Sequence, residues 1–458
     1  MAFSSTLVFT VKRREPELVA PAKPTPREIK KLSDIDDQEG LRFQMPMMFF
    51  YRDNPSMREK DPVGVIREGL AKALIYYYPF AGRIVEGDNR KLAVDCNSKG
   101  VLFIEADANL KIEQLGENIL PPCPFMEEFL HDVPGSGGII GCPLLLIQVT
   151  RFICGGFALG IRFNHTMADA YGMMQFVNAI TEFVKGACAP SILPVWQREQ
   201  HFNARSPPRI TCTHNEYEQI PQNKSSSDIV DSDKMIRTAI FFSPQDIQAL
   251  RNHMSSLGNF GRCSRFELIT AYLWKCRTIA LNPVDPNEVV RLSAITNARG
   301  KPGLNIPTGY YGNGFTFPAA LSAAGILCTS PLSYAVQLIQ NAKAQQSEEY
   351  IKSVADLLVI KKRPKYTRSW NLLVSDITRL GFDKVDFGWG NPAWGGIPFA
   401  TSNISVCMNF KNRKGEDGIV VSICLPPLAV ENSNMSLRRW LVIRLFAECK
   451  LIYMFRCA

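Results

Sequence analysis

The chain has 458 residues, of which 46% are hydrophobic and 21% charged, the balance of an ordinary globular protein with room for two or three domains. Its 52 basic and 43 acidic residues give a net charge of +9, and no stretch interleaves basic and aromatic side chains as nucleic-acid-binding surfaces do. No uncharged apolar run reaches 18 residues, so we expect neither a nucleic-acid partner nor a membrane-spanning helix.

The 13 cysteines are irregularly spaced and contain no Cys-x-x-Cys pair. An odd number in a long chain without a secretory signal predicts reduced thiols, and the apolar run that opens this chain is too short for such a signal. We therefore expect a cytoplasmic protein without stable membrane insertion.

The first elements predicted in chain order are a strand at Leu7–Val11, a proline-rich linker at Pro21–Asp37 and an aromatic strand at Met45–Tyr51. Apolar residues at helical spacing then predict an amphipathic helix over Pro62–Tyr78. Two neighbouring strands joined by a tight turn are predicted after it, at Leu144–Phe152 and Gly156–Phe163.

His165 lies where the second of these strands gives way to a helix. Apolar residues alternate before it, and after it they recur at helical spacing until Gly186. Asp169 follows four residues later, near the expected helix start. Such junctions commonly present catalytic side chains, because rigid elements hold both ends of the loop. We interpret His165 as a candidate catalytic base; a core histidine bonded to a backbone carbonyl is the alternative.

Residues 200–233 are polar and rich in proline, serine, asparagine and threonine. A loop of this length is uncommon inside a compact domain, so we interpret it as a crossover between two halves. The predicted domains are residues 1–199, which carry His165, and residues 234–458.

The second half opens with a helix predicted over Ser264–Arg277, where Ser264 and a glutamate three residues later form a capping box. In the stretch Asn297–Gly314, Arg299 is interpreted either as an anion ligand or as the partner of a buried carboxylate such as Asp169. The strands predicted in this half are Val290–Thr296 and a hairpin of Ile404–Phe410 with Gly418–Leu425.

The loop Asp386–Gly390, DFGWG, places two aromatic residues between glycines, so it can pack tightly while another backbone comes close. We interpret it as a structural loop anchored by Phe387 and Trp389, with Asp386 as a secondary candidate acid or base. No G-x-S-x-G elbow, P-loop or dinucleotide fingerprint occurs, and no histidine pair has metal-ligand spacing. These absences argue against the common serine hydrolases, phosphotransferases, Rossmann oxidoreductases and zinc enzymes.

HTMAD at His165–Asp169 and DFGWG at Asp386–Gly390, in this order, resemble the paired motifs of the BAHD acyltransferases of plants. Further matching stretches run over nearly the whole chain: LSDIDD, YYYPFAGR, CPLLLIQVTRF, SRFELITAYLWKCR and YYGNGF. The stretches LSDIDDQEGLRFQ, LPPCP, PPRITCTHNEYE and GYYGNG are most similar to the branch of fruit alcohol acyltransferases and benzyl alcohol O-benzoyltransferases.

The resemblance implies an α/β protein of two similar-sized mixed-sheet domains, chloramphenicol-acetyltransferase-like, with a channel between them. A segment near 375–400 is a candidate for packing with the first domain. Acyl-CoA would enter the channel from one face as a co-substrate and a small alcohol from the other, with His165 between them. The resemblance further implies a monomer, and we expect no metal and no permanently bound cofactor.

The implied reaction is acyl transfer from a CoA thioester to an alcohol, with His165 taking the hydroxyl proton as the oxygen attacks. In this family Asp169 is expected to point away from the substrates and to pair with an arginine, for which Arg299 is the candidate. The DFGWG loop is expected to lie away from the reacting atoms, which gives Gly388 and Trp389 a structural role.

Ser264, Arg299 and Ser375 lie in matching stretches and are candidate contacts for CoA. Four residues indicate an apolar, adaptable wall for the acceptor: Phe43, Met45, Met47 and Met48. Packing in the protein core explains the same residues equally well.

The chain departs from the family pattern after CLPP, and from Val430 onward we find no resemblance. The final stretch, Leu437–Ala458, is interpreted as a packed helix, as a cationic helix on a membrane surface, or as the product of a shifted reading frame or retained intron. The competing hypothesis is therefore a non-catalytic binding protein on the same fold, inactivated by this C-terminus. A hydrolase that uses His165 to activate water is a third.

Overall fold

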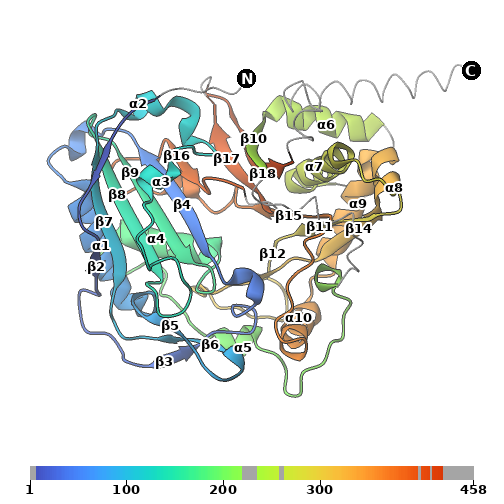
Figure 1. Cartoon of the computed structure of the whole chain (residues 1–458), viewed down its shortest axis with the longest axis horizontal. Helices are drawn as coiled ribbons and strands as arrows, with labels where there is room; N and C mark the ends of the chain where they lie inside the picture. Colours follow the sequence, from blue (N-terminus) through green and yellow to red (C-terminus); the bar gives the residue numbers. More distant parts are fainter. Residues whose placement is uncertain (1–6, 219–234, 257–261, 401–403, 413–414, 427–458) are drawn as a thin grey trace, which may run out of the picture.

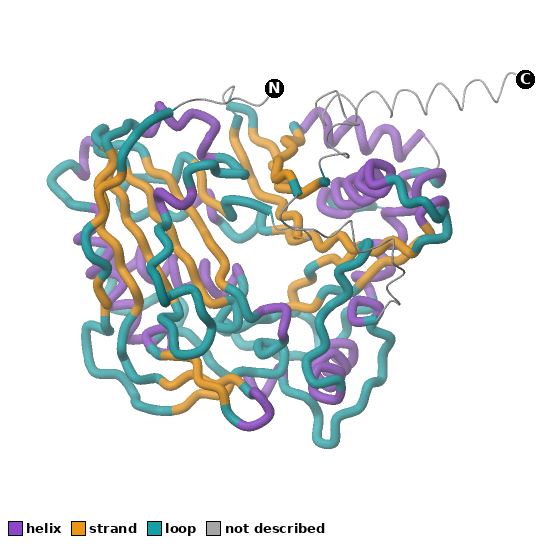
Figure 2. The backbone as a smooth tube through the Cα atoms, viewed as in Figure 1, coloured by secondary structure: helices purple, strands orange, loops and turns teal. Residues whose placement is uncertain are grey.

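A computed structural model of the chain describes residues 7–218, 235–256, 262–400, 404–412 and 415–426. The described residues form two α/β domains, each built on its own mixed sheet (Figures 1 and 2). None of the described helices is long and apolar enough to span a bilayer.

The first domain contains a seven-stranded sheet among the described residues. Its strands in spatial order are β1 (Val11–Arg13), β7 (Val101–Ala108), β8 (Leu145–Phe152), β9 (Phe157–Asn164), β4 (Gln44–Tyr51) and β16 (Trp394–Gly396), with β2 (Glu17–Val19) also paired to β7. Only β7 and β8 run parallel among these pairs, so the sheet is mixed. The strands predicted on either side of the turn before Phe157 are confirmed as the antiparallel pair β8 and β9.

Two long helices, α1 (Pro62–Tyr76) and α4 (Ala170–Val184), pack against each other in the first domain. Helix α1 begins as its sequence predicts, because Asp61 accepts hydrogen bonds from the next N–H groups and Pro62 occupies the first turn. Helix α4 ends at Val184, just before the expected stop at Gly186. The shorter elements of this domain are β3 (Ile29–Lys31), β5 (Arg83–Glu86), β6 (Leu92–Asp95), α2 (Ile112–Leu115) and α3 (Met126–Phe129). Helix α5 (Arg198–Phe202) lies at the start of the connection to the second domain.

The second domain contains a six-stranded mixed sheet, again counted over the described residues. Its strands in spatial order are β10 (Ile236–Phe242), β18 (Asp417–Leu425), β17 (Ile404–Lys411), β15 (Asn371–Asp376), β11 (Val289–Ala294) and β14 (Ala319–Ala323). Strand β15 runs parallel to both of its neighbours, and the predicted hairpin is confirmed as β17 with β18. A separate two-stranded ladder joins β12 (Thr296–Asn297) and β13 (Phe315–Thr316).

The helices of the second domain are α6 (Pro244–Ser256), α7 (Arg265–Leu281), α8 (Ala324–Thr329), α9 (Leu332–Ala344) and α10 (Glu348–Ile360). The predicted capping box of α7 is present, because Ser264 accepts from the N–H of Glu267 while the Glu267 side chain accepts from the N–H of Ser264. Trp274 of this helix is fully buried in the core of the second domain.

A segment late in the sequence packs into the first domain. Strand β16 pairs with β4, and Phe382, Phe387, Trp389 and Trp394 belong to the same buried cluster as the first sheet. Of the segment near 375–400 that was expected to pack with the first domain, Ser375 and Asp376 belong instead to β15 of the second sheet. The packing against the first domain has a physical basis in the aromatic content of the segment, since large apolar side chains gain most from burial.

Some expectations differ from the structure. The first strand lies at Val11–Arg13 and not at Leu7–Val11, because its pairing partner β7 begins to match it only at Val11. Part of the predicted crossover loop is helical at its start, where α5 extends to Phe202. The rest of that loop beyond residue 218, and the C-terminal stretch Leu437–Ala458, lie outside the described residues.

Candidate active site

The backbone of His165 is fixed by segments from both domains. His165 lies between the end of β9 and the start of α4, as predicted. Its N–H donates to the carbonyl of Phe43 at 2.9 Å, and its carbonyl accepts from Asn313 Nδ2 at 2.9 Å. The loop is therefore held on both sides, which limits the positions that the imidazole can reach.

The imidazole of His165 is surrounded by aromatic rings. The ring centroids of Phe43, Phe163 and Phe315 lie 5.1, 5.7 and 6.3 Å from it, and only 9% of the residue is exposed. Its buried Nδ1 has no hydrogen-bond partner among the described residues. Burial lowers the pKa of His165 below its ordinary value, and the nearby carboxylate of Asp169 offsets only part of this effect. The ring is therefore neutral at pH 7, the form that accepts a proton.

His165 lines a cavity of about 160 Å³ between the two domains. The wall is mostly apolar, and the polar groups on it come from a few side chains. The apolar lining includes Phe43, Met45, Met47, Phe163, Phe315, Phe317, Leu373 and Val406, and the polar lining includes Asp169, Asn297, Arg299, Ser375 and Asp376. Three of the four residues proposed for an apolar wall are therefore present, whereas Met48 is fully buried and does not line the cavity.

A second, more polar cavity of about 340 Å³ adjoins the first. Both cavities are lined by Tyr171 and Leu380, so these two side chains stand between them. The second cavity also carries Gln175, Glu182 and Arg379. The first cavity is lined by residues of both domains, whereas the second is lined by residues 171–192 with Arg379 and Leu380.

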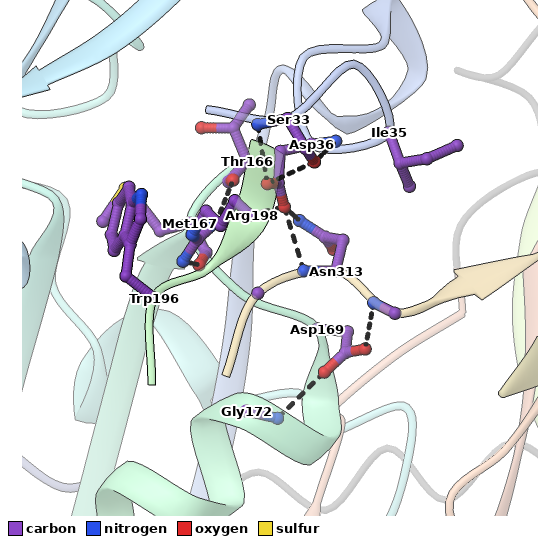
Figure 3. Close-up of polar contacts among 12 residues, drawn as sticks. Ser33, Ile35, Asp36, Thr166, Met167, Asp169, Gly172, Trp196, Arg198 and Asn313 are labelled. Carbon is purple, nitrogen blue, oxygen red and sulfur yellow. Dashed lines mark hydrogen bonds and ion pairs between the residues drawn. The ribbon is translucent and has the colours of Figure 1, made fainter. Parts of the chain in front are cut away.

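Asp169 caps helix α4 and forms an ion pair with Arg299. Its Oδ1 accepts from the N–H of Gly172 at 2.9 Å in the first turn of the helix (Figure 3). Arg299 donates to both carboxylate oxygens, at 2.7 and 3.1 Å, a bidentate arrangement that is stronger than a single contact. The N–H of Gly314 donates to Oδ2 at 3.0 Å. The pairing expected between Asp169 and Arg299 is thus present, and it joins the two domains.

Gly172 shows how closely the domains meet at this point. A Cβ atom at this position would lie 2.1 Å from the carbonyl oxygen of Tyr311, closer than any real contact. Only glycine therefore allows the first turn of α4 to approach the loop that contains Tyr311.

The DFGWG loop does not line the His165 cavity. Asp386 accepts from the N–H groups of Gly388 and Gly390 at 2.7 and 2.8 Å and from Lys185 at 3.0 Å. Burial alone would raise the pKa of Asp386, but these three donors outweigh it, so the pKa lies below its ordinary value. The carboxylate is therefore ionised at pH 7 and already satisfied, an arrangement suited to holding the loop.

The aromatic residues of this loop anchor it to the first sheet. Phe387 is fully buried, and the Trp389 ring meets the Phe157 ring edge to face at 5.2 Å. Gly388 has a φ of +104°, and a Cβ there would lie 2.7 Å from Met57 Cε. The positive φ explains the glycine, since other residues are strained there, whereas the flexible end of Met57 could move aside.

The three candidate CoA contacts lie in different settings. Ser264 caps helix α7 and does not line either of the two cavities, whereas Ser375 and Arg299 line the cavity beside His165. The guanidinium of Arg299 is already engaged by Asp169 and by the carbonyl of Gly312. Of the three candidates, Ser375 therefore lines the cavity without taking part in the ion pair of Asp169 with Arg299.

Three buried polar residues next to the His165 loop were not identified as functional from sequence. Asp36 and Arg198 are both fully buried and form an ion pair at 3.1 Å, and Asn313 contacts both Asp36 and His165. Asp36 and Asn313 lie in LSDIDD and YYGNGF, two of the stretches that resemble the family. A charged or amide residue inside such a stretch is the sequence feature that could have marked them as functional. Arg198 lies in none of them.

Known proteins resemble this chain along most of its length. The sequence matches the Transferase family over residues 9–435. It is 54% identical to a benzyl alcohol O-benzoyltransferase of Petunia hybrida, with 93% of each chain covered, and 54% identical to alcohol acyltransferase 16 of Actinidia chinensis var. chinensis, with 96% of this chain and 95% of that protein covered.

Solved structures share the fold. Vinorine synthase superposes with a TM-score of 0.71 at 23% identity over 92% of this chain and 96% of that chain. The TRI101 protein of F. graminearum in complex with coenzyme A and T-2 mycotoxin superposes with a TM-score of 0.75 at 15% identity, over 90% and 98% respectively. With the family match over most of its residues and relatives at 54% identity, the chain belongs to the BAHD acyltransferases, as its paired motifs predicted.

Proposed function

We propose that this acyl-CoA-dependent alcohol O-acyltransferase uses His165 as its general base. The observation that carries the proposal is a neutral imidazole that lines the cavity between the two domains. A general base must be deprotonated at the working pH and must face the space where the substrate binds. His165 meets both conditions.

The proposed reaction proceeds in two steps without a covalent enzyme intermediate. The alcohol is too weak an acid to ionise beforehand, so His165 takes the hydroxyl proton while the oxygen attacks the thioester carbon. The tetrahedral intermediate then collapses, the C–S bond breaks, and the thiolate of CoA leaves. The imidazolium returns the proton to this sulfur, so that the ester and free CoA are released and His165 is neutral again.

Asp169 and Arg299 are proposed to support the base without touching the substrates. Each group is largely committed to the other and to backbone groups of α4 and of the loop before β13. The positive charge of Arg299 balances the carboxylate of Asp169. An unpaired carboxylate at this place would raise the pKa of His165 further. Gly388 and Trp389 are proposed to act only through the packing of their loop.

The acceptor is proposed to be a small apolar alcohol. The cavity volume of about 160 Å³ is close to that of an apolar protein cavity, on the order of 150 Å³, that holds benzene. Phe43, Met45 and Met47 offer an aromatic and thioether wall that adapts to ligand shape. A benzyl or short aliphatic alcohol, with a benzoyl or acetyl donor, fits this wall.

We also propose that the chain acts as a cytoplasmic monomer, divided into residues 1–199, the crossover 200–233 and residues 234–458. Residues on both sides of the crossover line the His165 cavity, so one copy supplies the complete lining described above. Ser375 is the proposed CoA contact on this wall, because Ser264 lines neither cavity and the guanidinium of Arg299 is engaged by Asp169. Size-exclusion chromatography with light scattering tests the monomer.

The function is tested by mixing the full chain with benzoyl-CoA or acetyl-CoA and benzyl alcohol, butanol or hexanol. Free thiol and ester are then measured together. Ester formed in equal amount to thiol supports the proposal. Thiol released at the same rate without alcohol would assign a hydrolase, and absence of both products with CoA still bound would assign a non-catalytic binding protein.

A further inference from the structure

We propose that Arg198 is a positioning residue for His165, acting through a fully buried ion pair with Asp36. The inference rests on the proposed role of His165 as the base. It concerns the loop that carries the imidazole, because a single polar network holds the carbonyls of three consecutive residues, His165, Thr166 and Met167. Figure 3 shows Arg198, Asp36 and Asn313 of this network beside Thr166 and Met167.

Arg198 holds two of these carbonyls directly. Its Nη1 donates to the carbonyl of Thr166 at 3.4 Å, and its Nη2 donates to the carbonyl of Met167. The Trp196 ring covers one face of the guanidinium, with its centroid 4.0 Å from Cζ. A planar, stacked guanidinium has its orientation fixed, so it fixes the carbonyls that it binds.

The third carbonyl is held through Asp36. Asp36 Oδ1 lies 3.1 Å from Arg198 Nη1 and accepts from both the backbone N–H and Nδ2 of Asn313, each at 2.9 Å. Asn313 Nδ2 in turn donates to the carbonyl of His165 at 2.9 Å. Asp36 Oδ2 accepts from the N–H and hydroxyl of Ser33, so the carboxylate itself is held in place.

The network therefore fixes the backbone that carries the imidazole, and with it the position of the ring in the cavity. One guanidinium serves two carbonyls and a carboxylate from the fixed fork of its donors, and the single ammonium of a lysine lacks this fork. Misplacing a reacting group by about 1 Å can reduce turnover on the order of 10²-fold. Loosening the loop at Thr166 and Met167 is expected to reduce turnover without reducing affinity, because neither residue's carbonyl faces substrate.

The test compares two double variants in the full-length protein. Asp36→Asn with Arg198→Met removes both buried charges at once, which avoids leaving one uncompensated. The amide oxygen that Asp36→Asn introduces can still accept from Asn313, whereas its amide nitrogen cannot accept from the N–H of Ser33. The double variant therefore loses the hydrogen bonds to the Thr166 and Met167 carbonyls together with the anchoring of residue 36 by Ser33. The matched control is Asp356→Asn with Arg205→Met. In the wild type Arg205 forms an ion pair with Asp356, a fully buried carboxylate of helix α10.

The expected result is a kcat at least about 10-fold lower for the Asp36/Arg198 double variant, with KM for both substrates close to wild type. The Tm shift should resemble that of the control, whose kcat stays near wild type. Arg198→Lys should keep the ion pair and the Tm but restore kcat only in part.

Wild-type kcat in the folded Asp36/Arg198 double variant would overturn the inference, as would loss of the folded state in every Arg198 variant while the control folds. His165→Ala is measured alongside. Full activity of His165→Ala would refute the proposed base, whereas an inactive His165→Ala with fully active Arg198 variants would refute only the positioning role.

Discussion

The carboxylate of Asp169 is shared between Arg299 of the second domain and the first turn of helix α4 in the first domain. One oxygen caps the helix at Gly172 while both oxygens accept from the guanidinium. The residue four positions after His165 thus fixes the helix that follows the loop and ties that helix to the other half of the protein.

Replacing Asp169 separates these two contributions. Asp169→Asn keeps an oxygen for the helix cap but loses the ionic bond, and since both side chains are nearly buried it should lower the free energy of unfolding by about 1.5–3 kcal/mol. Asp169→Ala should cost about 1 kcal/mol more, the contribution of the cap. Urea denaturation of both variants measures the two steps, and equal destabilisation would contradict the capping role.

Asp386 is predicted to serve the loop and not the reaction. Asp386→Ala should lower the Tm, because two backbone N–H groups and Lys185 lose their acceptor. Its kcat per folded molecule should stay close to wild type. Thermal unfolding and initial rates on the same preparation decide this, and a loss of kcat as large as that of His165→Ala would make Asp386 part of the chemistry.

Two serines from matching stretches are expected to behave differently. Ser264→Ala removes the cap of α7 and should cost about 0.5–2 kcal/mol of stability without raising KM for acyl-CoA. Ser375→Ala leaves stability nearly unchanged and should raise that KM, because Ser375 lines the cavity. Denaturation curves and KM values for acyl-CoA distinguish them, and the reverse pattern would assign CoA contact to Ser264.

The pH dependence follows from the burial of His165. Because burial lowers its pKa, the imidazole stays neutral to a lower pH than a free histidine, whose pKa is about 6.5. The acid limb of kcat/KM should therefore have its midpoint below about 6.5, with activity retained above it. A pH profile of initial rates measures this midpoint, and a value well above that of free histidine would mean that the ring is stabilised as a cation.

Local patterns in the sequence were sufficient for much of the fold. Alternation before His165 and helical spacing after it predicted β9 and α4, and the serine and glutamate at 264 and 267 predicted the start of α7. These elements obey rules that act within a few residues. The first strand was placed too early, because its bounds depend on the partner strand β7 and not on its own residues.

The parts that sequence could not provide depend on contacts between distant segments. Arg198 and Asp36 are far apart in the chain, and only the fold brings both charges together beneath the His165 loop. Burial of a charged pair cannot be inferred from residue type, since arginine and aspartate are usually exposed. The resemblance to a known family indicated that Arg299 pairs with Asp169. The sequence around Arg299 alone left open whether this arginine binds an anion or a buried carboxylate.

The role of His165 is the central claim, and His165→Ala tests it most directly. The control is His201→Ala, since His201 Nδ1 donates to the Leu304 carbonyl and the residue does not line the cavity. With acyl-CoA binding measured by calorimetry and ester formation by initial rates, the account predicts that His165→Ala still binds acyl-CoA but loses about 10²–10⁴-fold in kcat, while His201→Ala remains active. Ester formation by His165→Ala at the wild-type rate would contradict the account.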